Sequence, residues 1–119
     1  MARGVRRGDF WLHQFGTPDR RRPVLVLTRD VMASRLHTVT VAPVTSTIRG
    51  TPTEVRVGVA QGLKHECVVN LDHVQTVRRT DLHQWLGRLG SGRMFDVCLA
   101  LNAALGCEAS MVREEPFLF

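Results

Sequence analysis

The first two thirds of the chain consist of short apolar or alternating runs separated by turn residues. Residues 23–28 (PVLVLT) form a continuous apolar run, and residues 53–59 (TEVRVGV) alternate between apolar and polar positions. Gly, Pro, Thr and Asp gather between such runs, as turns require. The pattern predicts short strands at residues 8–15, 23–28, 38–44, 53–59, 66–71 and 73–78. A series of this kind indicates a small barrel or a strongly coiled sheet.

The final third changes to a helical period. The spacing of Leu82, Trp85 and Leu89 predicts a short helix over residues 80–90, opened by Thr80 as its N-cap. A clearer helix is predicted for residues 91–106. Ser91 is its expected N-cap and Gly106 its expected C-terminal stop. The apolar stripe between them comprises Met94, Val97, Leu101 and Leu105.

Length and hydropathy bound the organisation of the chain. With 119 residues and 44% hydrophobic residues, residues 1–119 are expected to form one domain with a modest core. No apolar run approaches the ~20 residues of a membrane-spanning helix. The N-terminal stretch lacks the apolar segment of a secretory signal. We therefore expect a cytoplasmic protein that makes no membrane contact.

The chain is strongly basic, with a formal net charge of +5 and a pI of about 10.4. Such a balance favours a polyanionic partner such as nucleic acid. Arg20, Arg21 and Arg22 stand directly before Pro23 and the apolar run that follows it. These guanidinium groups are either held at a strand end for an anion or belong to a solvated basic loop.

Cysteine and histidine spacing predicts neither a metal site nor a cofactor. Cys67, Cys98 and Cys107 form no CxxC pair, and the five histidines include no HxxxH or HExxH spacing. Cys98 falls within the helical apolar pattern and is predicted to be a small core residue. The glycines of residues 86–92 (LGRLGSG) lack the Lys-Ser/Thr of a phosphate-binding loop.

Hydroxyl side chains follow the third predicted strand, in residues 41–49 (VAPVTSTIR). Thr45 and Ser46 come directly after its apolar run, and Arg49 closes the segment. Hydroxyls at a strand end can cap backbone groups. They can also bind a phosphate together with guanidinium groups, if the arginine-bearing strand ends meet them at one rim of a barrel.

Four motifs occur in a characteristic order, and together they resemble the MazF/PemK family of toxin endoribonucleases of type II toxin–antitoxin pairs. They are RRGDFWL (6–12), RRPVLVLTRD (21–30), TVTVAPVTSTIR (38–49) and VVNLDHVQTVRRTDL (68–82). The predicted C-terminal helix stands where the family has its last helix. The resemblance covers about residues 6–106, which leaves 107–119 as a C-terminal tail.

The resemblance implies a mainly β fold with appended helices (α+β): a small SH3-like β-barrel with a C-terminal α-helix, assembled as a homodimer. It further implies a sequence-selective endoribonuclease that uses no metal or other cofactor. Its substrate would be single-stranded RNA (mRNA, tRNA or rRNA), cut to leave 2′,3′-cyclic phosphate and 5′-hydroxyl ends. A cognate antitoxin protein would inhibit it.

The resemblance also implies roles for particular residues. The family's catalytic arginine maps onto Arg22 and its catalytic Thr/Ser onto Thr45; both can bind phosphate oxygens. Asp9 of the opening motif is expected to fix the local turn and strand register. The spacing of residues 10–12 predicts Trp11 as the exposed aromatic for base stacking, with burial at a dimer interface as the alternative. His13 and His37 are candidates for proton transfer, and the simpler expectation for each is a surface residue. The RNA-binding residues expected around the catalytic pair are Arg7, Arg20, Arg21, Ser46, Arg49, Trp11 and His13.

The chain departs from the family between its first two strands. Residues 16–23 (GTPDRRRP) lack the Glu and Gln that many members carry there, and Asp19 is the only nearby acidic substitute. Two other functions stay open. One is a gyrase-directed (CcdB-like) toxin of the same barrel fold, which lacks the arginine–hydroxyl site. The other is a non-catalytic RNA-binding barrel, since a fold alone does not define an activity.

Overall fold

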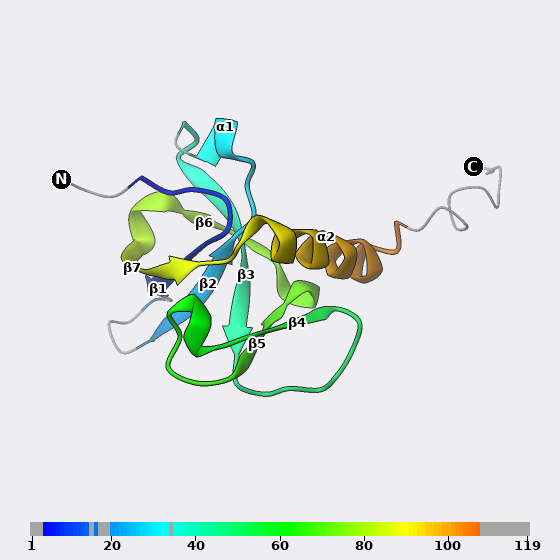
Figure 1. The fold of residues 1–119 in the computed structure, drawn as a ribbon. Helices are drawn as coiled ribbons and strands as arrows, with labels where there is room; N and C mark the ends of the chain where they lie inside the picture. Colours follow the sequence, from blue (N-terminus) through cyan, green and yellow to red (C-terminus); the bar gives the residue numbers. More distant parts are fainter. Residues whose placement is uncertain (1–3, 15, 17–19, 34, 108–119) are drawn as a thin grey trace, which may run out of the picture.

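The computed structural model describes residues 4–14, 16, 20–33 and 35–107. A curved antiparallel sheet forms the body of the molecule, and a long helix packs against it (Figure 1). The strands are β1 (Asp9–Gln14), β2 (Arg21–Val26), β3 (Thr38–Thr45), β4 (Glu54–Val57), β5 (Cys67–Asn70), β6 (Gln75–Arg78) and β7 (Leu82–Arg88). The helices are α1 (Asp30–Ala33) and α2 (Ser91–Leu105), with 3₁₀ turns η1 (Val59–Gln61), η2 (Leu71–His73) and η3 (Arg79–Asp81).

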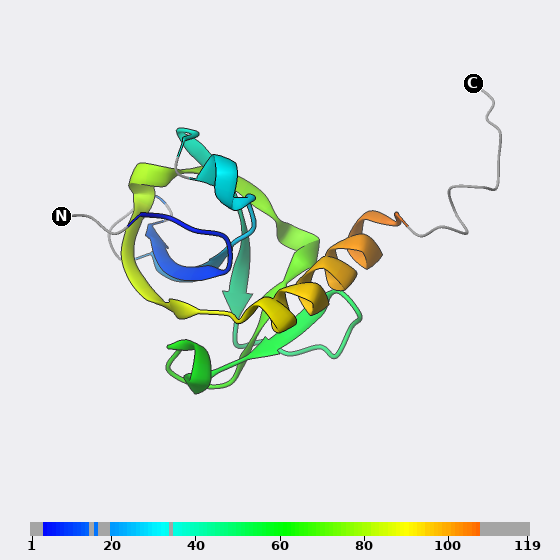
Figure 2. The same ribbon diagram turned by 45° about the horizontal axis from the view of Figure 1, so that its top comes forward.

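The strand order is β4-β5-β3-β2-β1-β7, and β6 pairs with the first half of β3. Figure 2 shows how far the sheet curls. Within the described residues no ladder joins β4 to β7, so the sheet is not a closed barrel. Gly62, directly after η1, instead packs against the backbone of Leu86 in β7. The predicted α+β class, mostly β with a C-terminal helix, is confirmed.

Every strand predicted in the first two thirds is present, with shorter or slightly shifted bounds. β2 begins at Arg21, two residues before the predicted start at Pro23, so two of the three consecutive arginines belong to the strand itself. β3 continues through Thr45, which makes the candidate hydroxyl its last residue.

The helix predicted for residues 80–90 is wrong. Residues 82–88 form β7, which pairs with β1, and Thr80 lies within η3. The ladder shifts register twice, and such irregularities allow Leu82 and Trp85, three residues apart, to pack against the same apolar cluster. The bulged strand therefore imitates the spacing of a helix.

The second predicted helix is confirmed as α2, and Gly106 ends it in the left-handed conformation with φ +71°. Its N-cap is Gly90 instead of Ser91. The buried face comprises Met94, Val97 and Ala100, so the stripe stops early, and Leu105 is 62% exposed. Cys98 is exposed beside this face, so its predicted core position is wrong. No helix in the described ranges is long and apolar enough to cross a membrane.

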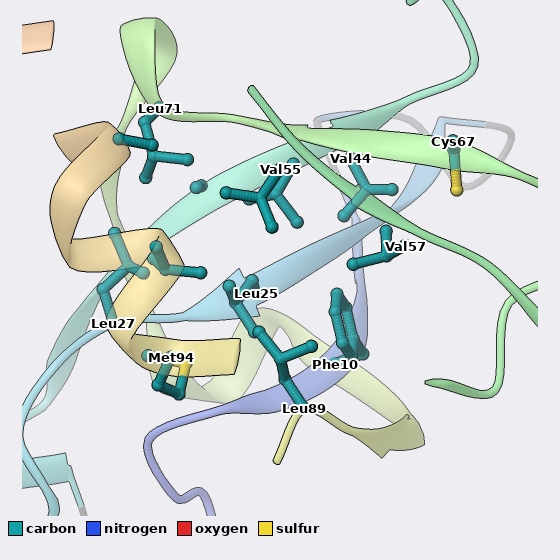
Figure 3. Close-up of a cluster of buried hydrophobic side chains, with 14 of the residues drawn as sticks. Phe10, Leu25, Leu27, Val44, Val55, Val57, Cys67, Leu71, Leu89 and Met94 are labelled. Atoms are coloured by element: carbon teal, nitrogen blue, oxygen red, sulfur yellow. The ribbon is translucent and has the colours of Figure 1, made fainter. Parts of the chain in front are cut away.

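The sheet buries apolar side chains on both faces. Figure 3 shows the first core cluster, which includes Phe10, Leu25, Val44 and Leu71 and is closed by α2. The second core cluster lies on the other face of β1 and β2 and comprises Val5, Trp11, Val24, Val26, Val39, Val41, Val77 and Leu82. Because Val24 and Val26 of β2 alternate with Leu25 and with Leu27, the residue that follows the strand, this segment contributes to both clusters.

Asp9 joins the start of β1 to the end of β7. This buried carboxylate accepts the backbone N–H of Arg6 at 3.0 Å and a guanidinium N–H of Arg88 at 2.8 Å. The structural role predicted for Asp9 is thereby confirmed, because its two oxygens fix both the turn and the strand pair.

Candidate functional site

Arg22 and Thr45 lie at neighbouring ends of two antiparallel strands. β2 begins at Arg21, and β3 ends at Thr45. Their ladder pairs Val24 with Pro43, so the same register continued by two residues places Arg22 opposite Thr45. Side chains two residues apart along a strand share a face, and opposed side chains on one face lie within reach of each other. One rim of the sheet therefore presents a guanidinium and a hydroxyl together.

Arg22, Val44 and Thr45 border two hollows in the surface, which meet at these residues. The first hollow has a volume of about 470 Å³ and the second about 600 Å³. The other polar side chains of the first hollow are Arg20, Thr47, Arg49, Glu54, Asn70, His73 and Gln75. Those of the second hollow include Arg21, Ser46, Lys64, His65 and Gln84. Cationic side chains thus line both sides of the rim.

The hydroxyl of Thr45 keeps its proton available. Its Oγ1 accepts the backbone N–H of Thr47 at 3.1 Å, and a hydroxyl that accepts one hydrogen bond can still donate another. Arg22 is exposed at the same rim and presents a planar fork of donors. A tetrahedral phosphate can accept bonds from both groups at once.

Glu54 shapes the loop that carries Arg49. Its carboxylate accepts the backbone N–H of Arg49 at 3.1 Å and that of Gly50 at 2.9 Å. Arg49 consequently lines the first hollow from a loop whose backbone is fixed by β4. The carboxylate of Glu54 is thus engaged in this turn, and Glu54 and Arg49 both line the first hollow.

Most of the residues expected from the sequence meet at this rim. The structure brings together Arg20, Arg21, Arg22, Thr45, Ser46 and Arg49 around the two hollows. Asp19 lies outside the described residues. Within the described ranges no group of three His, Cys, Asp or Glu side chains is arranged to hold a metal ion.

Arg7 lies away from both hollows. Its guanidinium donates to the backbone oxygen of Leu27 and to Sγ of Cys98, and its backbone N–H donates to Asp30 at 2.8 Å. These contacts tie the segment before β1 to the residue that follows β2, to the start of α1 and to the middle of α2. Arg7 lines a separate hollow beside α2.

The exposure predicted for Trp11 and His13 is wrong. Trp11 is only 6% exposed, because it packs in the second core cluster opposite Val24 and Trp85. His13 is 5% exposed and borders neither hollow, although it is the ladder partner of Arg22. Burial lowers the pKa of His13 below its usual 6.5; Asp81 opposes this shift and His83 adds to it.

Sequence reasoning missed several residues of the two hollows, among them Glu54, Lys64, His65, Asn70 and His73. His65 and His73 stand close to the two ends of β5. The one sequence feature that could have identified these two histidines is their position beside a predicted strand. The pairing of β5 with the end of β3, which brings them to the rim, is a long-range contact that the local pattern does not encode.

The family comparison identifies the class of protein as a toxin of the kind found in type II toxin–antitoxin pairs. Residues 6–105 match the family model described as PemK-like, MazF-like toxin of type II toxin-antitoxin system, and the chain belongs to this family.

Individual relatives agree with this assignment. The chain is 39% identical over 104 residues to a Mycobacterium tuberculosis protein named probable endoribonuclease MazF2, covering 87% of this chain and all of the relative. It is 48% identical over 71 residues to endoribonuclease MazF3 of the same organism, covering 60% of this chain and 69% of that protein.

Solved structures show the same architecture. Mycobacterium tuberculosis toxin MazF-mt6 superposes with a TM-score of 0.76 at 38% identity, over 82% of this chain and 96% of the toxin. A mycobacterial endoribonuclease in complex with its cognate antitoxin gives a TM-score of 0.78 at 26% identity, over 88% of this chain and 98% of that one.

Proposed function

We propose that this toxin is a sequence-selective endoribonuclease that cleaves single-stranded RNA. The observation that carries the proposal is the meeting of Arg22 and Thr45 at one rim, between two hollows lined by further cationic side chains. A phosphate held at this rim is flanked on both sides by surface that can receive the neighbouring nucleotides. The names of the two Mycobacterium tuberculosis relatives support the same activity.

In the proposed reaction the ribose 2′-oxygen attacks the adjacent phosphorus and the bond to the 5′-oxygen breaks. The products are a 2′,3′-cyclic phosphate and a 5′-hydroxyl, with the 2′-proton lost and one proton gained by the leaving oxygen. Arg22 binds a non-bridging oxygen in a bidentate fork, and Thr45 donates its hydroxyl proton to a phosphate oxygen. Both contacts strengthen as negative charge grows in the transition state, and they stabilise that charge. In enzymes that use a metal ion, the ion can supply this stabilisation.

A cognate antitoxin is proposed as the natural inhibitor. One structural relative is titled as a complex with its cognate antitoxin, and this chain carries a net charge of +5. An acidic, extended or helical segment laid over the two hollows would match their charge and cover the rim. Such a segment would prevent RNA from binding and would thereby inhibit the toxin in the cytoplasm.

A homodimer is also part of the proposal. Phe95, Leu99 and Leu105 of α2 are 64%, 53% and 62% exposed, an amount of apolar surface on one helix that a second copy could cover. Sedimentation equilibrium of the purified protein gives the stoichiometry directly.

The test of the activity is cleavage of a long single-stranded RNA in EDTA, with the new ends identified chemically. We expect discrete cuts with cyclic phosphate and 5′-hydroxyl ends at a recurring sequence. Folded protein that cuts no RNA, tRNA included, yet poisons DNA gyrase would identify the gyrase-directed alternative. Binding of RNA without cutting would identify a non-catalytic barrel.

A further inference from the structure

The geometry points to His65 as the general base of the proposed cleavage, the group that takes the proton of the attacking 2′-hydroxyl. This inference rests on the proposed function and deepens it. Neither Arg22 nor Thr45 is a base: the guanidinium keeps its proton, and a threonine hydroxyl is a weak acceptor of one. A proton acceptor beside the pair is therefore still required.

The two hollows lie on opposite faces of the sheet at this rim. Pro43 and Gln75 line the first hollow, and they pair in the ladders with Val24 and Val41 of the second core cluster. Val44 borders both hollows, whereas Leu63 and Cys67 of the first core cluster line only the second. A phosphate at Arg22 and Thr45 would thus have one hollow on each side. In-line displacement places the entering and leaving oxygens on opposite sides of phosphorus, and the two hollows offer room for the nucleotides on either side of that phosphate.

His65 occupies the second hollow in a tautomer suited to accept a proton. Its Nδ1 lies 3.1 Å from the backbone oxygen of Glu66. A carbonyl oxygen can only accept a hydrogen bond, so Nδ1 carries the proton and the lone pair of the neutral ring is on Nε2. The side chain is exposed and reachable by substrate. After proton uptake the same Nδ1–H bond persists, because it suits the imidazolium equally well.

His73 in the first hollow has the opposite arrangement. Its Nδ1 lies 3.5 Å from Nδ2 of Asn70, whose Oδ1 accepts the backbone N–H of Asp72 at 2.9 Å. An amide NH₂ only donates, so Nδ1 of His73 is the acceptor and Nε2 carries the proton. In this state His73 can donate a hydrogen bond from Nε2 but cannot take a proton there.

The other titratable groups of the two hollows are poor bases in this setting. Glu54 is engaged by the backbone N–H groups of Arg49 and Gly50. Burial is the larger cause and the charge of Glu66 the smaller cause of a raised pKa of the Cys67 thiol. The same thiol donates a hydrogen bond to the backbone oxygen of His65. Among the described residues that line the hollows, His65 alone combines exposure with a free lone pair in the stated tautomer.

The proton balance of the step is complete with water as the second partner. The 2′-hydroxyl proton passes to Nε2 of His65 as the 2′-oxygen bonds to phosphorus. The bond from phosphorus to the 5′-oxygen breaks, and that oxygen takes a proton from water. His65 then returns its proton to the hydroxide that remains, so enzyme and solvent end as they began.

The test is single-turnover cleavage of a short RNA that wild type cuts, combined with chemical rescue by imidazole. We expect His65→Ala to cut about 10²–10⁴-fold more slowly while binding an uncleavable 2′-deoxy analogue normally. Added imidazole should restore part of the lost rate, since it supplies the missing base in the space vacated. His65→Gln, which keeps a donor for the Glu66 oxygen but takes no proton, should stay slow.

Matched variants separate this role from others. His73→Ala and Arg22→Ala should gain nothing from imidazole, and His83→Ala, an exposed histidine of β7 outside both hollows, should cut as wild type does. A wild-type rate in His65→Ala or His65→Gln would overturn the inference, as would a folded, RNA-binding His65→Ala whose loss imidazole leaves unchanged. If wild type itself cuts no RNA, the proposed function fails instead.

Discussion

At the residue scale, the residue paired with Arg22 across the neighbouring strand is His13. The two are ladder partners in β1 and β2, and His13 is buried where Arg22 is exposed. Burial lowers the pKa of His13 from 6.5, with the negative charge of Asp81 opposing and His83 adding to the shift. The folded state therefore favours the neutral imidazole, and protonation of this ring works against the strand pair that presents Arg22.

This shift predicts how stability depends on pH. Because the folded pKa lies below the unfolded value, the unfolded chain binds more protons as pH falls through 6.5. The free energy of unfolding of wild type should therefore be lower at about pH 5.5 than at about pH 7.5, as measured by urea denaturation. His13→Gln should show a smaller difference, and exposed His37→Gln should keep the wild-type difference. An equal pH effect in wild type and His13→Gln would contradict this explanation.

The residues of the rim differ in how far the sequence foretells them. Arg22 and Thr45 stand beside strongly patterned strands, so their placement at strand ends follows from local sequence. His65 depends on the approach of β5 to β3, and burial of Trp11 and His13 depends on a second core cluster. Alternation along β1 cannot reveal that both of its faces are covered, because the covering residues come from distant segments.

At the scale of elements, the second hollow is built by a close approach between η1 and β7. A Cβ on Gly87 would collide with the backbone oxygen of Gln61, and one on Gly62 with that of Leu86. Gly62 also has φ +91°, which disfavours any residue with a side chain. The two glycines allow the backbones to touch where the sheet does not close.

Substitution of Gly87 tests this contact. Gly87→Ala forces two backbones apart and should lower the free energy of unfolding by at least about 2 kcal/mol in urea denaturation. The control is Gly92→Ala in α2, where an added Cβ meets nothing within 4 Å. It should raise stability by up to about 1 kcal/mol, because alanine favours helix over glycine. Equal effects of the two substitutions would show that the approach at β7 is not tight.

Element prediction succeeds or fails here for a physical reason. The runs at residues 23–28 and 38–44 are dense in β-branched side chains and occupy central strands, so local pattern and environment agree. β7 is an edge strand with two register shifts, and its apolar spacing follows the bulges instead of a regular period of two. β7 forms a strand because it pairs with the edge of β1 that β2 leaves open.

At the scale of the whole molecule, several cationic side chains gather around one rim. Arg20, Arg21, Arg22 and Arg49 line the two hollows of a chain with a net charge of +5. Each phosphate contact on single-stranded nucleic acid releases about 0.7 of a counterion. Four such contacts would make the logarithm of RNA affinity fall with a slope of about −3 against the logarithm of salt concentration.

The salt slope separates rim arginines from others. Affinity for an uncleavable 2′-deoxy analogue is measured over a range of salt concentrations by fluorescence anisotropy. Arg49→Gln should reduce the steepness by about 0.7, and Arg35→Gln, exposed outside both hollows, should leave it unchanged. A slope that responds equally to both substitutions would mean that net charge, and not the rim, binds RNA.

The overall architecture was easier to predict from the sequence than single residues or elements, because recognisable motifs span most of the chain. The ordered motifs and the C-terminal helix indicate the family and its α+β class. The family match confirms the family, and the observed strands and helix confirm the class. Closure of the barrel was not predictable, because it depends on whether β4 and β7 meet after every bulge and twist between them. In this chain Gly62, which follows η1, packs against β7 where β4 would close the barrel.

The measurement that tests the central claim most directly is single-turnover RNA cleavage by Arg22→Ala and Thr45→Val, beside Thr45→Ser and Arg35→Ala as controls. Each of the first two should cut roughly 10²–10³-fold more slowly than wild type while remaining folded, because each removes one contact to the developing charge. Thr45→Ser keeps the hydroxyl and Arg35 is outside the rim, so both controls should stay close to wild type. Full activity in folded Arg22→Ala or Thr45→Val would contradict the assignment of the reaction to this pair.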